Sequence, residues 1–227
     1  MRVAAVLCTY NESAALPEVL ARLKAAVADL LVVVVDDDSP DGTARVAESH
    51  GARVILRQGV PRGRGLSGRE GYRRALELGV DAILEMDADG SHDPADAPKL
   101  LEALSRADIA VGSRAAASGG GDRRGAIRRA VSAAAKFFLR RTLGLPLADP
   151  TSGYRAFRRE SLWAIDPGSL RSVGPEIVEE VYWKARQKGL RMVEVPIVFH
   201  KRAAGASKLT LIKLVRVLWR CWKLRLQ

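Results

Sequence analysis

The chain of 227 residues is poor in several residue types, and each scarcity excludes a class of protein. Its two cysteines, Cys8 and Cys221, lie far apart, which excludes a disulfide scaffold or a cysteine metal site and fits a reducing compartment. The three histidines, His50, His92 and His200, are scattered and are expected to support other groups rather than to bind metal. Aromatic residues make up only 5% of the chain, which argues against a stacking surface for nucleic acid.

Long apolar runs are also missing. No uninterrupted apolar run reaches 18 residues, so the sequence predicts no transmembrane helix. No signal peptide is expected either, because Asn11 and Glu12 interrupt the first apolar stretch at once. With 48% hydrophobic and 28% charged residues, the chain is expected to form one well-buried body. These features together predict a cytoplasmic protein.

The charge is divided unevenly along the chain. Residues 1–112 hold 13 Lys and Arg against 18 Asp and Glu, a net of −5. Residues 113–227 hold 24 against 8, a net of +16. An acidic first half suits a metal ion, and a basic second half suits an anionic partner, whether nucleic acid, a phosphorylated substrate or a membrane surface. The division alone does not choose among the three.

Short apolar runs alternate with helical patterns through the chain. We expect strands at residues 2–8, 30–35, 53–56, 82–86, 109–112 and 192–199, and helices at 14–28, 44–50, 72–78, 96–104, 126–143 and 175–188. This alternation predicts an α/β fold with a mostly parallel open sheet and helices on both faces. Residues 59–71, rich in Gly and Arg, are expected to form a mobile loop that contacts a nucleotide, and residues 147–155 to form a turn-rich loop.

An apolar run at residues 82–86 ends in two carboxylates, Asp87 and Asp89, followed by Gly, Ser, His, Asp and Pro. In an extended backbone, residues i and i+2 point the same way, so both carboxylates can aim at one point. Two oxygen ligands of this kind suit Mg²⁺ or Mn²⁺. The alternative is an ordinary Asp-rich turn. Because residues 8–12 and 35–38 also follow predicted strands, all three turns are expected at one edge of the sheet.

These turns read Cys-Thr-Tyr-Asn-Glu, Val-Asp-Asp-Asp-Ser-Pro-Asp-Gly-Thr and Met-Asp-Ala-Asp-Gly-Ser-His, and in this order they resemble the nucleotide-sugar half of an inverting family 2 glycosyltransferase of GT-A fold. Further motifs follow at residues 112–114 (GSR), 128–132 (RRAVS) and 149–155 (DPTSGYR). The whole series, over residues 1–210, is similar to the polyprenol-phosphate (dolichol-phosphate) mannose synthases. Such enzymes transfer mannose from GDP-mannose to a polyprenyl phosphate lipid, with Mg²⁺ or Mn²⁺. A related enzyme with another donor, such as UDP-glucose, is the main alternative.

The resemblance implies three groups of site residues. The metal ligands would be Asp87, Asp89 and Ser91, with Asp89 the principal one. The residues at the reacting groups and the acceptor phosphate would be Asp89, Arg114, Arg128 and Ser132. The nucleotide-sugar contacts would be Cys8, Tyr10, Glu12, Val35, Asp37, Asp87, Ala88, Arg202 and Lys208.

The sequence departs from the family pattern at a few positions. Cys8 stands where relatives usually have Pro, and Val178 where many have Gln, two positions before Glu180. Ala204 and Ala206 replace residues that are often charged. These changes bear on the donor sugar and the acceptor fit. The adjacent pair Glu179 and Glu180 forms one further set of carboxylates, and Asp149 forms another. Each set is expected either to line the site or to serve the fold.

The last predicted helix, residues 208–226, carries Lys213, Arg216, Arg220 and Lys223 in one stripe, with Leu, Val and Trp over the remainder. This pattern is typical of a helix in a membrane interface, and the alternative is a helix packed on the domain with a solvated basic face. We therefore expect a catalytic domain at 1–207 and a membrane-interface helix at 208–227. Either this helix suffices as an anchor or a separate membrane partner supplies one. Nucleic-acid binding, prompted by the basic half, is the more distant alternative.

Overall fold

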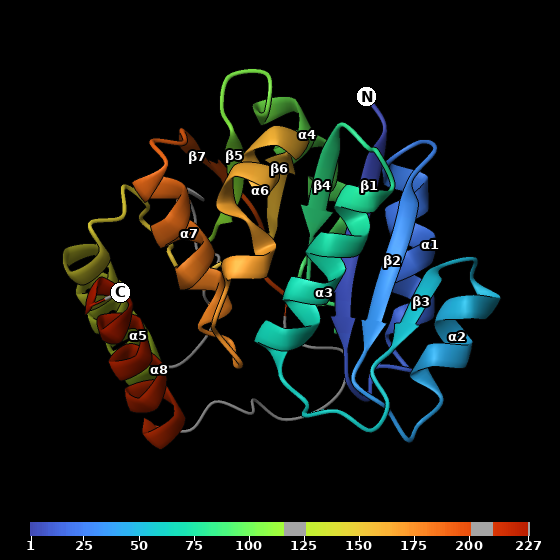
Figure 1. Cartoon of the computed structure of the whole chain (residues 1–227), viewed down its shortest axis with the longest axis horizontal. Coiled ribbons are helices and arrows are strands. Elements are labelled where there is room, and N and C mark those ends of the chain that lie inside the picture. The colour runs from blue at the N-terminus through green and yellow to red at the C-terminus, as the bar shows by residue number, and fades with distance from the viewer. Residues whose placement is uncertain (116–125, 201–210, 227) are drawn as a thin grey trace.

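The computed structural model describes residues 1–115, 126–200 and 211–226, and the side chains of 126–130, 211–214 and 226 lie outside this description. Seven strands form one sheet in the order β3-β2-β1-β4-β6-β5-β7 (Figure 1). Their bounds are β1 Val3–Thr9, β2 Leu31–Asp36, β3 Arg53–Leu56, β4 Ala82–Glu85, β5 Ile109–Ser113, β6 Arg155–Arg158 and β7 Met192–Pro196. Among the described strands, only β6 runs antiparallel to its neighbours, β4 and β5, so the predicted mostly parallel sheet is confirmed.

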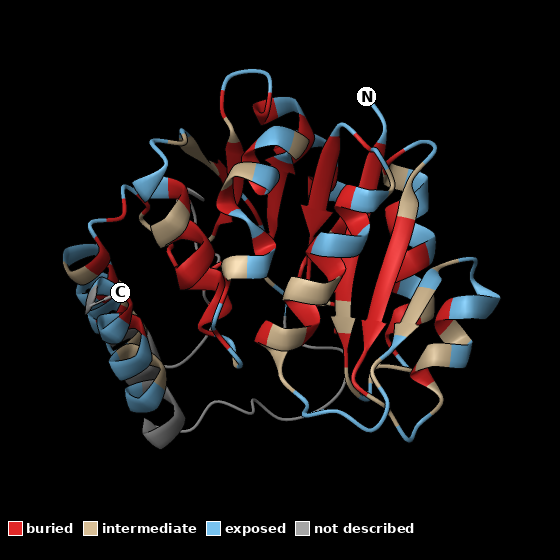
Figure 2. Ribbon diagram, in the orientation of Figure 1, coloured by how far each residue is buried: buried red, intermediate tan, exposed pale blue. Residues whose placement is uncertain are grey.

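Helices cover both faces of this sheet, as predicted. Their bounds are α1 Leu16–Ala26, α2 Thr43–Ser49, α3 Arg64–Glu77, α4 Ala97–Ala103, α5 Ala126–Leu143, α6 Arg159–Ile165, α7 Ile177–Gln187 and α8 Leu211–Lys223, with short 3-10 turns η1 Pro94–Asp96, η2 Pro167–Ser169 and η3 Leu224–Leu226. One core cluster packs α1, α2 and α4 against the sheet, and a second packs α3, α5, α6, α7 and α8 on the opposite face. The central strands β1, β2, β4, β5 and β6 are almost entirely buried, whereas the edge strands β3 and β7 are partly exposed (Figure 2).

The prediction of a mobile loop over residues 59–71 is wrong in its second half, because α3 begins at Arg64. Three glycines lower the helix propensity of this segment but are needed for packing. A Cβ at Gly65 would lie 2.1 Å from the carbonyl oxygen of Ser172, and one at Gly71 would lie 2.4 Å from Val6 Cγ1. The glycines therefore let α3 approach the neighbouring backbone and sheet closely.

The sequence reading also missed β6 and α6, and it extended β7 beyond its end at Pro196. Strand β6 has the sequence RAFR, in which a fully buried Arg155 replaces the apolar residue that a central strand usually shows. Because a turn-rich segment also precedes it, the sequence pattern does not indicate a strand there.

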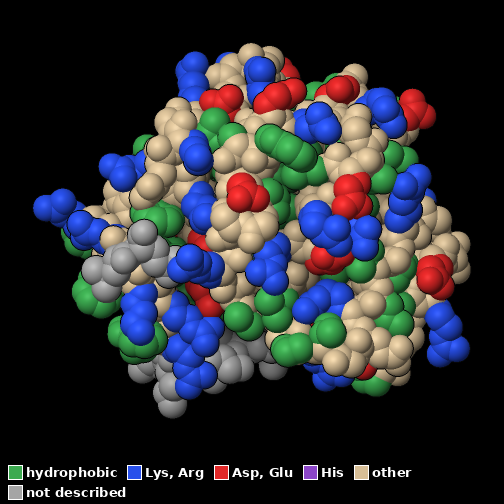
Figure 3. Space-filling view, viewed as in Figure 1, with side chains coloured by type: hydrophobic (Ala, Val, Ile, Leu, Met, Phe, Trp, Pro, Cys, Tyr) green, Lys and Arg blue, Asp and Glu red, His purple; other side chains and the backbone are tan. Residues whose placement is uncertain are grey.

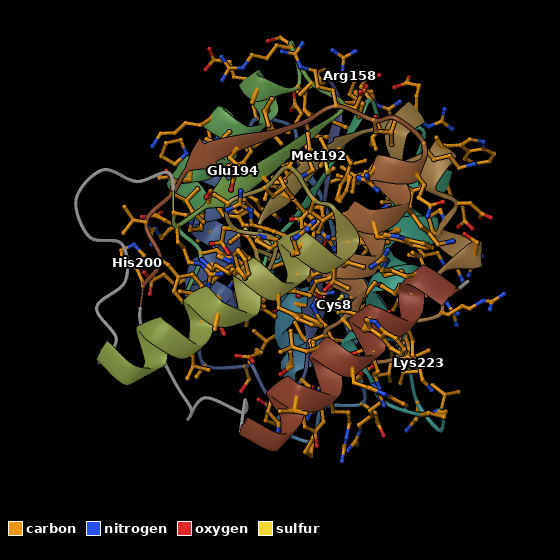
Figure 4. All side chains as sticks on the ribbon, turned by 90° about the vertical axis from the view of Figure 1, so that its left-hand side faces the viewer. Cys8, Arg158, Met192, Glu194, His200 and Lys223 are labelled. Carbon is orange, nitrogen blue, oxygen red and sulfur yellow. The ribbon has the colours of Figure 1, made fainter. Side chains whose placement is uncertain are left out.

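Helices α5 and α8 lie side by side at one end of the molecule (Figures 1 and 4). Cys221 and Leu224 from the C-terminal segment pack with Leu139 and Leu143 of α5 in the second core cluster. Part of the apolar side of α8 thus packs on the domain, as the alternative reading held, while Trp219 and other apolar side chains stay exposed. None of the helices in the described part of the chain is long and apolar enough to cross a membrane.

Candidate active site

The polar turns meet at one edge of the sheet. Because β1 lies between β2 and β4 and all three run parallel, the turns at residues 8–12, 35–38 and 86–92 emerge side by side, as predicted (Figure 1). The end of β5 brings residues 113–114 to the same edge. Since β6 runs the other way, residues 149–154, which precede it, also arrive there.

The two aspartates after β2 have different tasks. Asp36 is fully buried and accepts hydrogen bonds from Thr9 Oγ1 at 2.7 Å and from the Ser39 amide at 2.8 Å, so it ties two strand ends together. Asp37 accepts from Ser67 Oγ at 2.7 Å and from the Gly63 amide at 2.8 Å, and it also pairs with Arg57. Asp37 is thereby held rigidly at the site edge.

Arg62 joins the predicted nucleotide contacts on this side. Its Nη1 donates to the Tyr10 hydroxyl at 3.0 Å, its guanidinium lies 4.6 Å from the centre of the Tyr10 ring, and its Nε donates to the Asp37 carbonyl at 2.9 Å. Nearby, Glu12 is half-buried and its amide donates to Thr43 Oγ1. Sequence reasoning expected a nucleotide-contacting loop here but did not single out Arg62.

Val35 is buried and Cys8 is half-buried, although both are predicted nucleotide contacts. Val35 is fully buried against α3, and so its side chain packs rather than faces a ligand. Cys8 accepts a hydrogen bond from Arg64 Nη1 at 3.4 Å. Burial raises the pKa of the Cys8 thiol to about 12, although the Arg64 charge opposes this rise. The thiol is therefore protonated at neutral pH and is no nucleophile.

The loop after β4 carries Asp87, Asp89 and Ser91 within five residues. Asp89 is 4% exposed and its Oδ1 accepts from the Ser91 amide at 3.0 Å, while the Asp87 side chain is 37% exposed. Ala88 between them packs into the first core cluster. The Asp87 amide donates to Nδ1 of His92 at 3.1 Å, and burial lowers the pKa of His92, so a neutral ring fixes the start of this loop.

These residues fit a divalent cation shared with a substrate. The Ser91 hydroxyl is fully buried and has no hydrogen-bond partner among the described residues. An orphaned oxygen is costly unless something binds it. The described part of the chain contains no cluster of three or more His, Cys, Asp or Glu suited to a metal. Asp87, Asp89 and Ser91 therefore supply only part of an oxygen shell, which suits Mg²⁺ or Mn²⁺ completed by substrate oxygens and water.

An arginine clamp lies beside this loop, at the end of β5. Arg114 donates from Nε and Nη2 to the two carboxylate oxygens of Asp149 at 2.6 and 2.8 Å, and from Nη2 to Thr151 Oγ1 at 2.8 Å. Lys136 of α5 reaches the same carboxylate at 3.0 Å. Burial alone would raise the pKa of Asp149, but Arg114 and Lys136 hold it below its usual range. The backbone at Asp149 is anchored in turn by Glu194 of β7, labelled in Figure 4.

A buried ion network lies beneath the site. Glu85 of β4 accepts from Arg155 Nε and from the Tyr72 hydroxyl, each at 2.5 Å, and also pairs with Arg64. Burial by itself would raise the pKa of Glu85, but the charges of Arg155 and Arg64 lower it to about 2. Sequence reasoning did not identify this network, because its members come from three separate elements, α3, β4 and β6.

The two consecutive glutamates of α7 are both buried, but only Glu180 has recognised partners among the described backbone amides. Glu180 accepts from the amides of Arg171 and Ser172, each at 2.8 Å. Glu179 is 4% exposed and its Oε2 has no hydrogen-bond partner among the described residues. Burial raises the pKa of Glu179 to about 8.

Glu179→Gln should flatten the dependence of stability on pH. The pKa of Glu179 is about 8 in the folded protein, against 4.5 for the ordinary group, so its contribution to stability is fully present below pH 4.5 and is lost as the pH rises toward 8. Thermal unfolding at pH 5 and pH 8 should show a smaller drop in melting temperature for the variant. Glu160→Gln, at an exposed site on α6, should keep the wild-type drop; equal drops in all three proteins would contradict the assignment.

The remaining predicted site residues are partly described. Arg128 and Ser132 lie on α5, where Ser132 is half-buried and the side chain of Arg128 falls outside the description. Arg202 and Lys208 lie outside the described residues. Their roles stay predictions.

Comparison with known proteins agrees with this geometry. Residues 4–166 match the model of Glycosyl transferase family 2. The chain belongs to this family. The glycosyltransferase is 41% identical over 214 residues to an undecaprenyl-phosphate mannosyltransferase of Micrococcus luteus, covering 92% of this chain and 88% of the relative. It is 38% identical to a polyprenol monophosphomannose synthase of Mycolicibacterium smegmatis, covering 92% and 81%.

A solved structure supports the fold of the glycosyltransferase. The glucosyl-3-phosphoglycerate synthase of Mycobacterium tuberculosis, in complex with Mn²⁺, uridine diphosphate and glucosyl-3-phosphoglycerate, superimposes with a TM-score of 0.73 and covers 99% of this chain and 78% of that one. At 22% identity, this likeness bears on the fold alone. The predicted GT-A fold and the class of enzyme, a glycosyltransferase, are confirmed.

Proposed function

We propose that this glycosyltransferase moves mannose from GDP-mannose to the phosphate of a polyprenyl lipid, with inversion, at the cytoplasmic face of a membrane. The observation that carries the proposal is the position of the Asp87–Ser91 oxygen set beside the Arg114–Asp149 clamp at one sheet edge. The first suits a metal-bound diphosphate and the second an acceptor phosphate. The names of the two mannosyltransferase relatives support the sugar and the lipid class.

The donor would lie along the ends of β1, β2 and β4. Tyr10, Glu12 and Asp37 would contact the nucleoside, and Arg202 and Lys208 the diphosphate. Asp87, Asp89 and Ser91 would hold Mg²⁺ or Mn²⁺, which when bound neutralises negative charge on the departing nucleoside diphosphate. The metal-bound state of the Mycobacterium tuberculosis synthase is in keeping with this cofactor.

The acceptor needs orientation more than activation. A phosphate monoester is anionic at neutral pH and can attack the anomeric carbon without a general base. Arg114, with Arg128 and Ser132 of α5, would hold this phosphate by charge-assisted hydrogen bonds. Because Asp149 fixes the Arg114 guanidinium in advance, little side-chain entropy is lost when the acceptor binds. A single in-line displacement inverts the configuration at the anomeric carbon.

A panel of nucleotide sugars tests the proposal. The purified chain, polyprenyl phosphate in detergent and Mg²⁺ or Mn²⁺ are incubated with radiolabelled GDP-mannose, GDP-glucose, UDP-glucose or UDP-galactose. We expect label in the lipid fraction mainly with GDP-mannose and only when a metal is present. Preferential use of UDP-glucose would establish the main alternative, and no transfer from any donor would contradict the proposed reaction.

The helix pair α5 and α8 supports the membrane location. Exposed apolar side chains occur on both helices, namely Val131, Phe137, Phe138, Val215, Trp219 and Trp222. Basic residues lie among them, and Lys223 sits 3.7 Å from the centre of the Trp219 ring. Aromatic and basic side chains together suit the interface of an anionic bilayer.

Replacing both Trp219 and Trp222 by serine should weaken vesicle binding at least about tenfold, because two exposed aromatic rings no longer enter the interface. Flotation with phosphatidylcholine vesicles containing phosphatidylglycerol measures the effect. Trp163→Ser is the matched control, since Trp163 is 68% exposed on α6, away from the helix pair. Wild-type binding by the double variant would leave the anchor to a separate membrane protein.

Filter binding to DNA at the same ionic strength should be weak, and strong binding would favour the nucleic-acid alternative.

A further inference from the structure

A second basic site lies away from the sheet edge that carries the proposed chemistry. A cavity of about 380 Å³ opens where the C-terminal ends of α5 and α7 meet η3. Arg141, Arg186 and Arg225 line it, one from each element, together with Trp183. Lys and Arg side chains gather on this side of the molecule (left in Figure 3).

The cavity carries positive charge that the described residues leave uncompensated. Among the described residues, no Asp or Glu lines it. Within the described ranges, none of the three guanidiniums forms an ion pair or a hydrogen bond with an acidic side chain. By contrast, most arginines near the catalytic edge, such as Arg57, Arg64 and Arg114, pair with a carboxylate.

The position of Arg186 depends on a glycine. Gly144 follows α5 with a φ of +63°, and a Cβ there would lie only 2.9 Å from Cζ of Arg186. The missing side chain lets the guanidinium lie directly over the end of α5. The side chain of Arg186, although exposed, therefore lies against the turn that ends α5.

The surroundings of the cavity indicate which anion it takes. Phe138 precedes Arg141 by three residues and Trp222 precedes Arg225 by three, which puts each exposed aromatic ring beside an arginine of the cavity. A soluble phosphate would gain nothing from these rings. A phospholipid can place its phosphate among the arginines and its first apolar groups against the rings.

We propose that Arg141, Arg186 and Arg225 form a binding site for the phosphate of an anionic membrane phospholipid. The site is distinct from the acceptor site, because Arg141 lies thirteen residues, or about 20 Å, further along α5 than Arg128. It rests on the proposed membrane location and adds to it a fixed point at the far end of the helix pair. A contact there orients α5 along the bilayer, so that its N-terminal end, at the catalytic edge, faces the lipid acceptor.

The decisive comparison is between two arginines that differ in position but not in charge. Arg186→Gln removes one side of the cavity, whereas Arg140→Gln removes an exposed arginine that is adjacent to Arg141 but outside the cavity. Binding of the full chain is measured by flotation with vesicles of phosphatidylcholine alone and with one-fifth phosphatidylglycerol. We expect Arg186→Gln to weaken binding to the anionic vesicles about fivefold and Arg140→Gln less than twofold. Binding to neutral vesicles should not change.

Equal losses in the two variants would overturn the site, because they would indicate general attraction of charge to the surface. If Arg186→Gln does not fold, as judged by circular dichroism, Arg225→Gln replaces it.

Titration with inorganic phosphate is a second experiment. Arginine-dependent phosphate binding without any effect on binding to anionic vesicles would assign the cavity to a free anion and overturn the proposed phospholipid site. Mannose transfer to detergent-dispersed polyprenyl phosphate should be unchanged in Arg186→Gln. Unchanged selectivity for anionic vesicles in Arg186→Gln therefore contradicts this site alone, whereas absence of transfer in the wild type contradicts the proposed reaction alone.

Discussion

Asp89→Asn should lower the rate of sugar transfer at least about 100-fold, because one charged ligand of the proposed metal is lost where charge develops on the leaving group. The substitution keeps the shape of the side chain, and an amide oxygen can still accept the hydrogen bond that Asp89 Oδ1 receives from the Ser91 amide. The local fold is therefore expected to survive. Transfer of radiolabelled mannose and binding of Mn²⁺ in the presence of GDP, followed by electron paramagnetic resonance, should both fall.

Asp93→Asn provides the matched control in the same loop. Asp93 accepts from the Ala95 amide at 2.9 Å and pairs with Arg22 at 2.5 Å, so it closes the loop without belonging to the oxygen set. An asparagine can keep the cap, and transfer should stay within about threefold of wild type. Wild-type turnover by Asp89→Asn with Mg²⁺ or Mn²⁺ would show that the metal assignment is wrong.

The parts of the site that follow from strand order were predictable from the sequence. Apolar runs that end in acidic turns indicate strands, and parallel strands bring their carboxyl ends to one edge. The meeting of the turns at residues 8–12, 35–38 and 86–92 needed no knowledge of side-chain positions. Helix α5 was likewise predicted with its observed bounds, because its apolar residues recur at helical spacing over eighteen residues.

The parts that depend on long-range pairing were not predictable. Asp149 could be named as a candidate, but its partner Arg114 lies 35 residues earlier and meets it only because β5 and the segment before β6 share an edge. Arg62 and Arg64 lay in a segment whose glycines indicate a loop. Those glycines serve close packing against Ser172 and Val6, which no local pattern reveals.

Glu85→Gln should lower the free energy of unfolding by about 3–5 kcal/mol, the range expected when one partner is removed from a buried ion pair. Glu85 and Arg155 are both fully buried, and Arg155 also donates to the Val178 carbonyl at 3.1 Å and to the Tyr72 hydroxyl at 2.5 Å. The substitution leaves two guanidiniums, those of Arg155 and Arg64, without their carboxylate. Urea unfolding followed by circular dichroism measures the loss.

Glu70→Gln on α3 is the control for the loss of a carboxylate that pairs with two arginines. Glu70 contacts Arg73 and Arg74, but solvent reaches all three side chains and screens their charges. The unfolding free energy should change far less than in Glu85→Gln. A comparable loss in both variants would mean that the buried network adds nothing beyond an ordinary surface pair.

The pH dependence separates charge from packing. The pKa of Glu85 is about 2 in the folded protein against 4.5 for the ordinary group, so its contribution to stability is present above pH 4.5 and is lost as the pH falls toward 2. Wild-type stability should therefore decline over this interval, and the decline should be shallower in Glu85→Gln.

Because Glu85 is the last residue of β4, two residues before Asp87, the same ion pairs that stabilise the sheet also fix the strand end from which the metal-binding loop departs. Glu85→Gln should accordingly also bind Mn²⁺ less tightly under conditions in which it is folded. Unchanged Mn²⁺ affinity would show that the ion pairs stabilise the sheet without positioning the metal-binding loop.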